Sequence, residues 1–113
     1  MYFGSFKKNT FAGGYSSELA ESLLGGVKLV LVSELIPRYA WSDETRSYTD
    51  EVTARSIFVA SSDLSAPLEV KLPKEASVPS GVGFLSRVHL EGVEACQIRS
   101  QVYFRASGLK EDK

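Results

Sequence analysis

Cysteine and histidine are almost absent from this chain, and their scarcity excludes several kinds of site. The one cysteine, Cys96, cannot form an intrachain disulfide or a thiolate cluster, and its place in an alternating run predicts a buried, inert thiol. The one histidine, His89, would need several carboxylates around it to hold zinc, and no His-rich or Cys-rich spacing is present. We therefore expect neither a metal nor a cofactor.

Long apolar runs are also missing. Runs such as residues 29–32 are far too short to span a bilayer, and the N-terminus has no secretory hydrophobic region. The sequence therefore predicts a cytoplasmic protein without a membrane segment.

The chain has no excess of positive charge. Thirteen Lys and Arg residues face fourteen Asp and Glu residues, which is evidence against a histone-like polycation. A length of 113 residues with 43% hydrophobic residues predicts one folded globular domain. Any role with nucleic acid must therefore depend on where the charges are placed.

The first 26 residues differ from the rest. Residues 1–15 mix aromatics, glycine and two lysines without a steady period, so we expect an arm that can dock through aromatic side chains. In the following segment Ser16 or Ser17 can cap a helix, and Gly25 with Gly26 can end it. The prediction is an N-terminal arm and a short helix of about two turns. The aromatic residues of the arm are Phe3, Phe6 and Phe11.

From residue 27 the apolar residues repeat with a period of two, which predicts strands. The longest expected strand covers 26–41, and a turn at Gly92 is expected to separate the last two strands, with Phe84 and Ile98 facing inward. The prolines between 73 and 81 exclude a long helix there. The tail, 110–113, is polar and expected to fray. The other expected strands cover 52–60, 67–73, 82–92 and 95–108.

Five such strands without crossover helices predict an all-β, mainly antiparallel domain over 27–109. Closure into a small barrel would remove exposed edges. A five-stranded OB-like barrel is the first choice, because its first strand is long and can bend. An SH3-like barrel or a split sandwich is the alternative.

The last expected strand has a polar, basic outer face. Its outward residues, two apart, lie on one side, and the preceding strand adds two more; none of the seven is acidic. A solvated face is one interpretation. A positive groove for nucleic acid is the other. The seven residues are Gln97, Arg99, Gln101, Tyr103, Arg105, Arg87 and His89.

The segment 36–52, IPRYAWSDETRSYTDEV, is polar like an exposed turn but carries three large aromatics. Tyr39, Trp41 and Tyr48 can stack on the bases of single-stranded nucleic acid, and Arg38 and Arg46 can meet phosphates. Alternatively, the rings fold back and close the end of the barrel. Four acids in the same segment would repel phosphate unless they point away or pair with the arginines. The acids are Asp43, Glu44, Asp50 and Glu51.

Catalysis is not expected. No nucleophile-elbow pattern surrounds a serine, and strand parity places Cys96 inward and His89 outward. The glycine-rich spots lack the lysine and hydroxyl of a phosphate loop. A hydrolase therefore remains only a distant alternative.

Five pieces of the sequence carry a family resemblance. The succession ELIPRYAW, YTDEVTA, IFVA, LEVKLP and VHLEGVEACQIRSQVYFRASGL, over residues 28–109, resembles small proteins of Gram-positive integrative and conjugative elements and related phages. That family resembles single-stranded-DNA-binding proteins and includes helicase processivity factors. The most telling motifs are PRY, TDEV and VKLP. The resemblance implies an OB-like fold, single-stranded DNA binding without strong sequence preference, and contact with a helicase or relaxase.

The sequence thus predicts a non-enzymatic single-stranded-DNA-binding protein that supports replication or transfer of a mobile element or phage. The alternative is a small β-barrel that binds proteins and no nucleic acid. An uncovered strand edge would permit a homodimer. The predicted nucleic-acid-binding residues are Arg38, Tyr39, Trp41, Arg46, Tyr48, Arg55, Arg87, His89, Arg99, Gln101, Tyr103 and Arg105.

Overall fold

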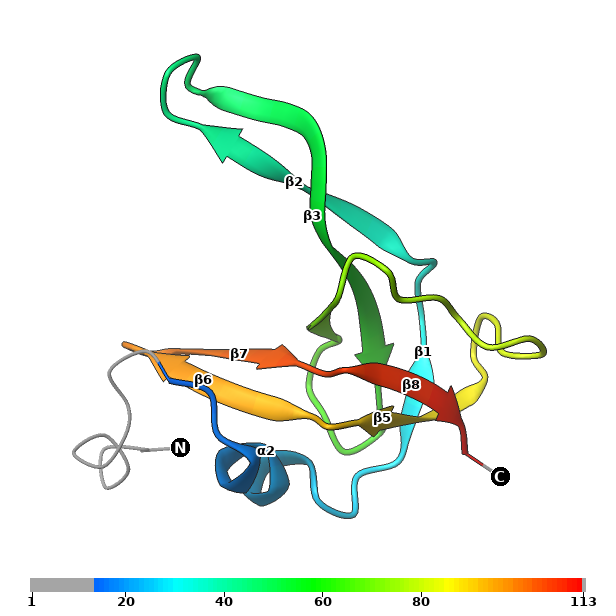
Figure 1. The fold of residues 1–113 in the computed structure, drawn as a ribbon. Helices are drawn as coiled ribbons and strands as arrows, with labels where there is room; N and C mark the ends of the chain where they lie inside the picture. The colour runs from blue at the N-terminus through cyan, green and yellow to red at the C-terminus, as the bar shows by residue number, and fades with distance from the viewer. Residues whose placement is uncertain (1–13, 113) are drawn as a thin grey trace.

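The fold is mostly β-sheet with one short helix, as Figure 1 shows. The structure is a computed structural model that describes residues 14–112. Most of the expected N-terminal arm, with Phe3, Phe6 and Phe11, therefore lies outside the described residues. The prediction of a β-rich chain with a short N-terminal helix is confirmed. The elements are α2 (Ser17–Leu24), β1 (Leu29–Leu31), β2 (Ile36–Ser42), β3 (Ser47–Ala60), β4 (Leu68–Leu72), β5 (Arg87–Glu91), β6 (Glu94–Ile98), β7 (Gln101–Arg105) and β8 (Gly108–Glu111).

The ends of helix α2 follow the expected local signals. Ser16 is the N-cap, and its Oγ accepts a hydrogen bond from the backbone N–H of Leu19 at 3.1 Å. Gly25 ends the helix, and its N–H donates to the carbonyl of Glu21 at 2.8 Å. A Cβ at position 25 would lie 2.6 Å from that same carbonyl oxygen, so the close approach requires glycine. The apolar face of α2, with Leu19 and Leu24 buried, packs against β6.

The prediction of one long first strand is wrong, because residues 32–35 interrupt it between β1 and β2. Val32 still donates its N–H to the carbonyl of Phe58 at 2.9 Å. At the next position the side chain of Ser33 takes over, since its Oγ accepts the N–H of Phe58 at 2.8 Å and donates to the carbonyl of Glu34 at 2.8 Å. One hydroxyl thus replaces a backbone acceptor, and the chain can turn before β2 begins.

We expect Ser33→Ala to lower the free energy of unfolding by about 1–3 kcal/mol, because the N–H of Phe58 would lose its partner in a half-buried place. Urea denaturation measures this change. Ser33→Thr keeps the hydroxyl and is the matched control, with a clearly smaller loss expected. Equal losses in the two variants would show that the hydroxyl does not hold the break.

The strands form one curled sheet in the order β6-β7-β4-β3-β1-β5-β8, with β2 paired to β3. The expected count of five strands is therefore wrong. All pairs are antiparallel except β4 with β7, where Val70 lies opposite Phe104 and Lys71 opposite Arg105. Along the chain β6 continues β5, and β8 continues β7, so the two ends of the order are joined by the chain itself. The core inside the curl includes Leu31, Ile57, Val59, Val70, Leu72, Val88, Leu90, Phe104 and Leu109.

The expected turn at Gly92 is also wrong. Gly92, with φ of 61°, bends the continuous β5–β6 stretch, and the hairpin turn lies at Arg99 and Ser100. Residues facing each other across a hairpin share one side of the sheet, so Cys96 and Tyr103 lie on the same side. The alternation of apolar and polar residues continues through Arg99 and Ser100, so the sequence pattern does not reveal the turn. For this reason Ile98, expected inward, is exposed.

Two further expectations fail near the C-terminal half. Phe84 was expected inward but is 72% exposed, because it lies in the loop before β5 and not in a strand. The tail was expected to fray, but strand β8 runs to Glu111 and pairs with β5, with Lys110 opposite His89. Cys96 is buried, as expected, but the expectation that it faces inward is wrong, because it lies on the same side of the sheet as the exposed Tyr103.

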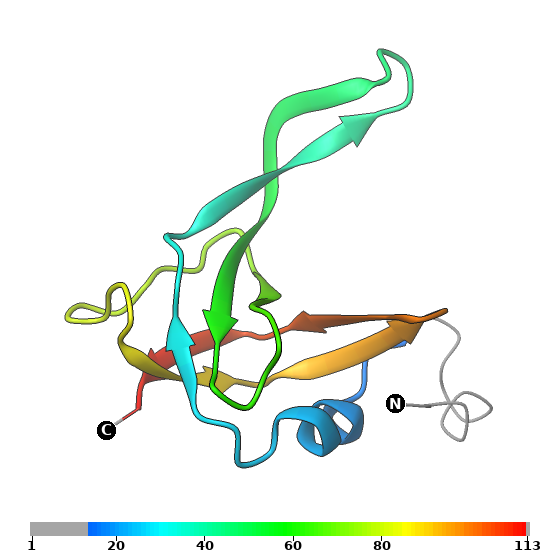
Figure 2. The same cartoon turned by 180° about the vertical axis from the view of Figure 1, so that it is seen from behind.

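Strands β2 and β3 extend beyond the sheet as a long two-stranded ribbon, which Figures 1 and 2 show projecting away from the body. Among the described residues β2 pairs with β3 alone. Register shifts on both sides of Tyr39 twist the ribbon. The segment 36–52, which has the polarity of an exposed turn, thus forms the ribbon, and its aromatic residues lie outside the core.

Candidate nucleic-acid interface

The outer face of the sheet is hollowed where β2, β3, β4 and β7 meet. On β4, Val70 and Leu72 are buried, so the intervening Glu69 and Lys71 face outward. One hollow of about 420 Å³ lies toward the ribbon, and another of about 540 Å³ lies toward β7. Arg38 and Lys71 line both hollows, which makes them one continuous surface. We call this surface the β4 face.

Arg38 is fixed at the middle of the β4 face. Its Nη2 pairs with the carboxylate of Glu69, and its Nε donates to Oγ of Ser56 at 3.3 Å. Ser56 is fully buried, so Arg38 also satisfies a buried hydroxyl. The guanidinium is therefore held in one position, but the carboxylate of Glu69 offsets its charge. This pairing was not predicted from the sequence.

Arg105 is also paired. Its Nε donates to Oε1 of Glu94 at 2.8 Å, and its Cζ lies 4.0 Å from the centre of the Tyr15 ring. Burial raises the pKa of Tyr15, the nearby Cys96 and Tyr103 raise it further, and Arg105 lowers it. The expectation of a basic face without acids is therefore wrong, since Glu94 shares the side of Arg105.

Lys71 is the cation that sequence reasoning missed. Among residues 14–112 no carboxylate lies within ion-pair distance of it, whereas Arg38 and Arg105 each have one. Its position between buried Val70 and Leu72 was a usable signal, because strand alternation places it outward. Its neighbours across the sheet could not be known from the sequence.

The aromatic residues of the ribbon are exposed. Tyr39 and Tyr48 line the hollow that also contains Arg38 and Lys71. Trp41 lies opposite Tyr48 and packs edge-on against it, with ring centres 5.0 Å apart and planes at 80°. Their exposed fractions are 43%, 70% and 54% for Tyr39, Tyr48 and Trp41. The alternative in which these rings close the barrel end is therefore wrong.

The other predicted residues of the last expected strand, 95–108, do not lie together in the structure. Gln101 and Tyr103 line the hollow near β7, so both belong to the β4 face. Arg99 is in the hairpin turn with φ of 58°. Gln97, from the expected outward set, lies on the opposite side of the sheet from Tyr103, and its amide donates to the carbonyl of Arg99 at 2.9 Å.

Two predicted arginines lie away from the hollows. Arg55 donates from Nε to the carbonyl of Lys74 at 2.7 Å and thereby ties β3 to the loop after β4. Arg46 lies in the turn at the ribbon tip, with φ of 56°. Neither lines the hollows of the β4 face.

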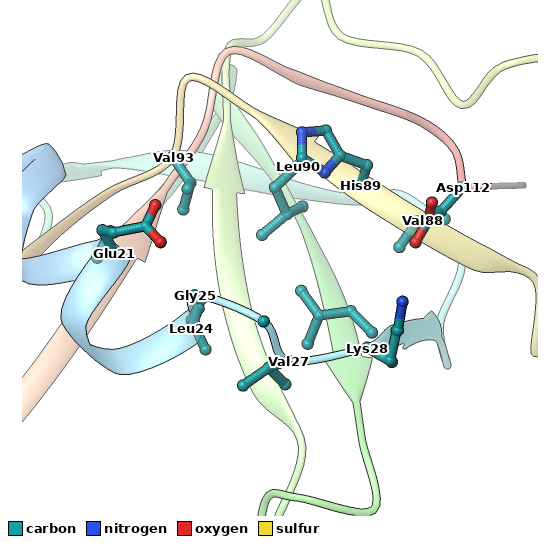
Figure 3. A pocket seen from close by; sticks show the side chains of 13 residues that line it. Glu21, Leu24, Gly25, Val27, Lys28, Val88, His89, Leu90, Val93 and Asp112 are labelled. Carbon is teal, nitrogen blue, oxygen red and sulfur yellow. The ribbon is translucent and has the colours of Figure 1, made fainter.

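Arg87 and His89 lie on another part of the molecule. Both are on β5, which β1 and β3 separate from β4 in the sheet. Figure 3 shows His89 above a different hollow, of about 330 Å³, with Glu21 at one side and Asp112 at the other. The expectation that Arg87 and His89 share a face with Tyr103 is wrong, because β5 pairs with β1 and β8 and not with β7.

Within residues 14–112 no group of three or more His, Cys, Asp or Glu side chains is placed to hold a metal ion. No helix formed by these residues has the length and apolar character that crossing a membrane needs. No protein-family model, curated protein or solved structure matches the chain. The family resemblance stays a prediction, and the β4 face must be judged on its own chemistry.

Proposed function

We propose that the protein binds single-stranded DNA without strong sequence preference, on an OB-like barrel. Counting β5–β6 and β7–β8 as one bent strand each, and setting β2 aside because it pairs with β3 alone, leaves five strands: β1, β3, β4, β5–β6 and β7–β8. Their pairing is antiparallel except between the third and the fifth, here β4 and β7. This pairing supports an OB-like barrel, in which β2 and the start of β3 would form the excursion between the first two strands.

OB-folds bind oligonucleotides on the face of their second and third strands and on the loops between strands one and two and strands four and five. The corresponding parts here are β3 and β4, the ribbon, and the turn at Arg99. The observation that carries the proposal is the continuous hollow surface on these parts. It joins Arg38 and Lys71 to exposed rings at both ends, Tyr39 and Tyr48 on the ribbon and Tyr103 on β7.

These residues suit a strand of phosphates and bases. Lys71 can meet a phosphate directly. Arg38 can exchange its exposed partner Glu69 for a phosphate at little cost, because exposed ion pairs contribute only about 0–1 kcal/mol. Every base has a flat face, so stacking on tyrosine rings gives affinity without sequence preference.

A role in replication or transfer of a mobile element or phage, in the cytoplasm and beside a helicase or relaxase, is supported by the family resemblance alone. The alternative, a barrel that binds only proteins, makes a different prediction for the β4 face. It needs no cation at Lys71.

A titration of fluorescent oligo-dT followed by anisotropy tests the proposal. We expect Lys71→Ala to weaken binding for all sequences alike and to reduce the salt slope by about 0.7, the contribution of one phosphate contact to a single strand. Glu69→Gln should act in the opposite direction and strengthen binding, since it releases the charge of Arg38. The two neighbouring exposed side chains of β4 are thus matched tests of opposite sign.

The outcome that would contradict the proposal is an absence of anisotropy change with micromolar protein at about 50 mM salt, where phosphate contacts are strong. Lys71→Ala and Glu69→Gln shifting affinity in the same direction would place the DNA elsewhere on the molecule.

A further inference from the structure

The outer end of the ribbon differs in charge from its base. We define the ribbon tip as Trp41 and Tyr48 with the acidic residues around them. Four carboxylates and one arginine lie in residues 43–51, and all are exposed. The acids are Asp43, Glu44, Asp50 and Glu51, and the arginine is Arg46.

The charge of the ribbon tip disfavours phosphate. Like charges repel, and no ion pair in the described part of the chain neutralises these carboxylates. The cations of the β4 face, Arg38 and Lys71, lie at the base of the ribbon. The ribbon therefore presents cations to an anionic ligand at its base and carboxylates to a cationic one at its tip.

The ribbon tip also presents apolar surface that is costly to leave exposed. Trp41 is half exposed although it packs edge-on against Tyr48, and its indole N–H donates to Oδ1 of Asp43 at 3.2 Å. Figures 1 and 2 show the ribbon standing clear of the sheet and of α2. An isolated two-stranded ribbon is marginal in water. Contact with a partner would both cover the rings and stabilise the ribbon.

We propose that the ribbon tip binds an arginine- or lysine-rich segment of a partner protein. The carboxylates pair with the cationic groups, while Trp41 and Tyr48 contact the aliphatic stems and the flat guanidinium groups. Trp41 and the four carboxylates do not line the hollows of the β4 face, and Tyr48 is the residue that the two surfaces share. The protein can therefore hold nucleic acid at the base of the ribbon and a basic protein segment at its tip.

Trp41 is the only tryptophan, so its fluorescence reports directly on the ribbon tip. The probe is a short synthetic peptide in which arginine alternates with serine, and the control peptide has glutamate in place of arginine. The arginine peptide should change the emission of Trp41, and the glutamate peptide should not. Neither measurement requires nucleic acid.

Two sets of substitutions localise the site. Asp50→Asn with Glu51→Gln leaves both rings in place and should weaken binding of the arginine peptide about five- to tenfold, from the loss of two exposed ion pairs. Trp41→Ala, followed by anisotropy of labelled peptide, should weaken it about tenfold. Asp63→Asn with Glu75→Gln removes two exposed acids from other loops and is the matched control, with no change expected. Circular dichroism checks that each variant is folded.

Three results would overturn the proposal. Equal weakening by the Asp63 and Glu75 control would show a general charge effect. Quenching of Trp41 by oligo-dT but not by the arginine peptide would assign the ribbon tip to nucleic acid. Self-association in sedimentation equilibrium that the Asp50 and Glu51 variant abolishes, without peptide binding, would make a second copy the partner. Peptide binding without oligo-dT binding would support this proposal and contradict the one for the β4 face.

Discussion

Replacing Tyr39 and Tyr48 together by alanine is expected to weaken oligo-dT binding by about 2–6 kcal/mol, because each base stacked on an aromatic ring contributes about 1–3 kcal/mol. Both rings are exposed and line the same hollow as Arg38 and Lys71. Anisotropy at constant salt measures the loss. The salt slope should hardly change, since no phosphate contact is removed.

The matched control is the double variant Tyr39→Phe with Tyr48→Phe, which keeps both rings and should bind within a few-fold of the original protein. It also separates stacking from folding, because a phenyl ring at position 48 can still pack against Trp41. Phe84→Ala removes an exposed ring from a loop away from the β4 face and should leave binding unchanged. If the alanine and phenylalanine variants bind equally well, no base stacks on these rings.

Features of the fold that depend on neighbours in the chain could be predicted from the sequence. Helix α2 begins and ends where Ser16 and Gly25 indicate, since a cap bonds within one turn. Strand β4 alternates between buried and exposed residues as its sequence does. The ribbon was also predictable, because polar residues between two strand-like runs favour a hairpin.

Features that depend on distant partners could not be predicted. The end of β1 depends on a hydrogen bond from the N–H of Phe58 to Oγ of Ser33, which is 25 residues away in the chain. The hydrophobic periodicity of the sequence does not indicate this bond. The turn at Arg99 does not interrupt the alternation of apolar and polar residues, so the sequence predicted a single strand from Gln97 to Arg105. Pairing across that turn then changes which residues share a side.

The same division holds for the candidate site. The rings of the ribbon stood out by composition alone. The partners of Arg38 and Arg105, by contrast, lie on other strands, and an ion pair such as Arg38 with Glu69 is visible only once the strand order is known. His89 was joined to Tyr103 by assuming that consecutive strands pair along their whole length, whereas β5 pairs with β1 and β8.

The curl of the sheet depends on a short contact between β4 and β7. Only two residue pairs form this parallel ladder, Val70 with Phe104 and Lys71 with Arg105, and the N–H of Ala106 adds a bond of 2.9 Å to the carbonyl of Lys71. Phe104 is 7% exposed, and its partner Val70 is fully buried. Because the backbone pairing between β4 and β7 is so short, we infer that the packing of the Phe104 side chain holds the two strands together.

Phe104→Ala is accordingly expected to lower the free energy of unfolding by about 3–5 kcal/mol, through lost burial and the cavity left behind. Urea denaturation with an unchanged slope measures this loss, and Phe104→Leu should lose clearly less because it refills most of the volume. Tyr103→Ala is the neighbouring control: its side chain is half exposed on the outer face, so the expected change in stability is below about 1 kcal/mol. Because the β4 face spans β4 and β7, a folded fraction of Phe104→Ala that keeps the sheet closed should still bind oligo-dT. A loss below that of Tyr103→Ala would mean that Phe104 does not hold β7 against β4, and the proposed OB-like barrel would lose its main support.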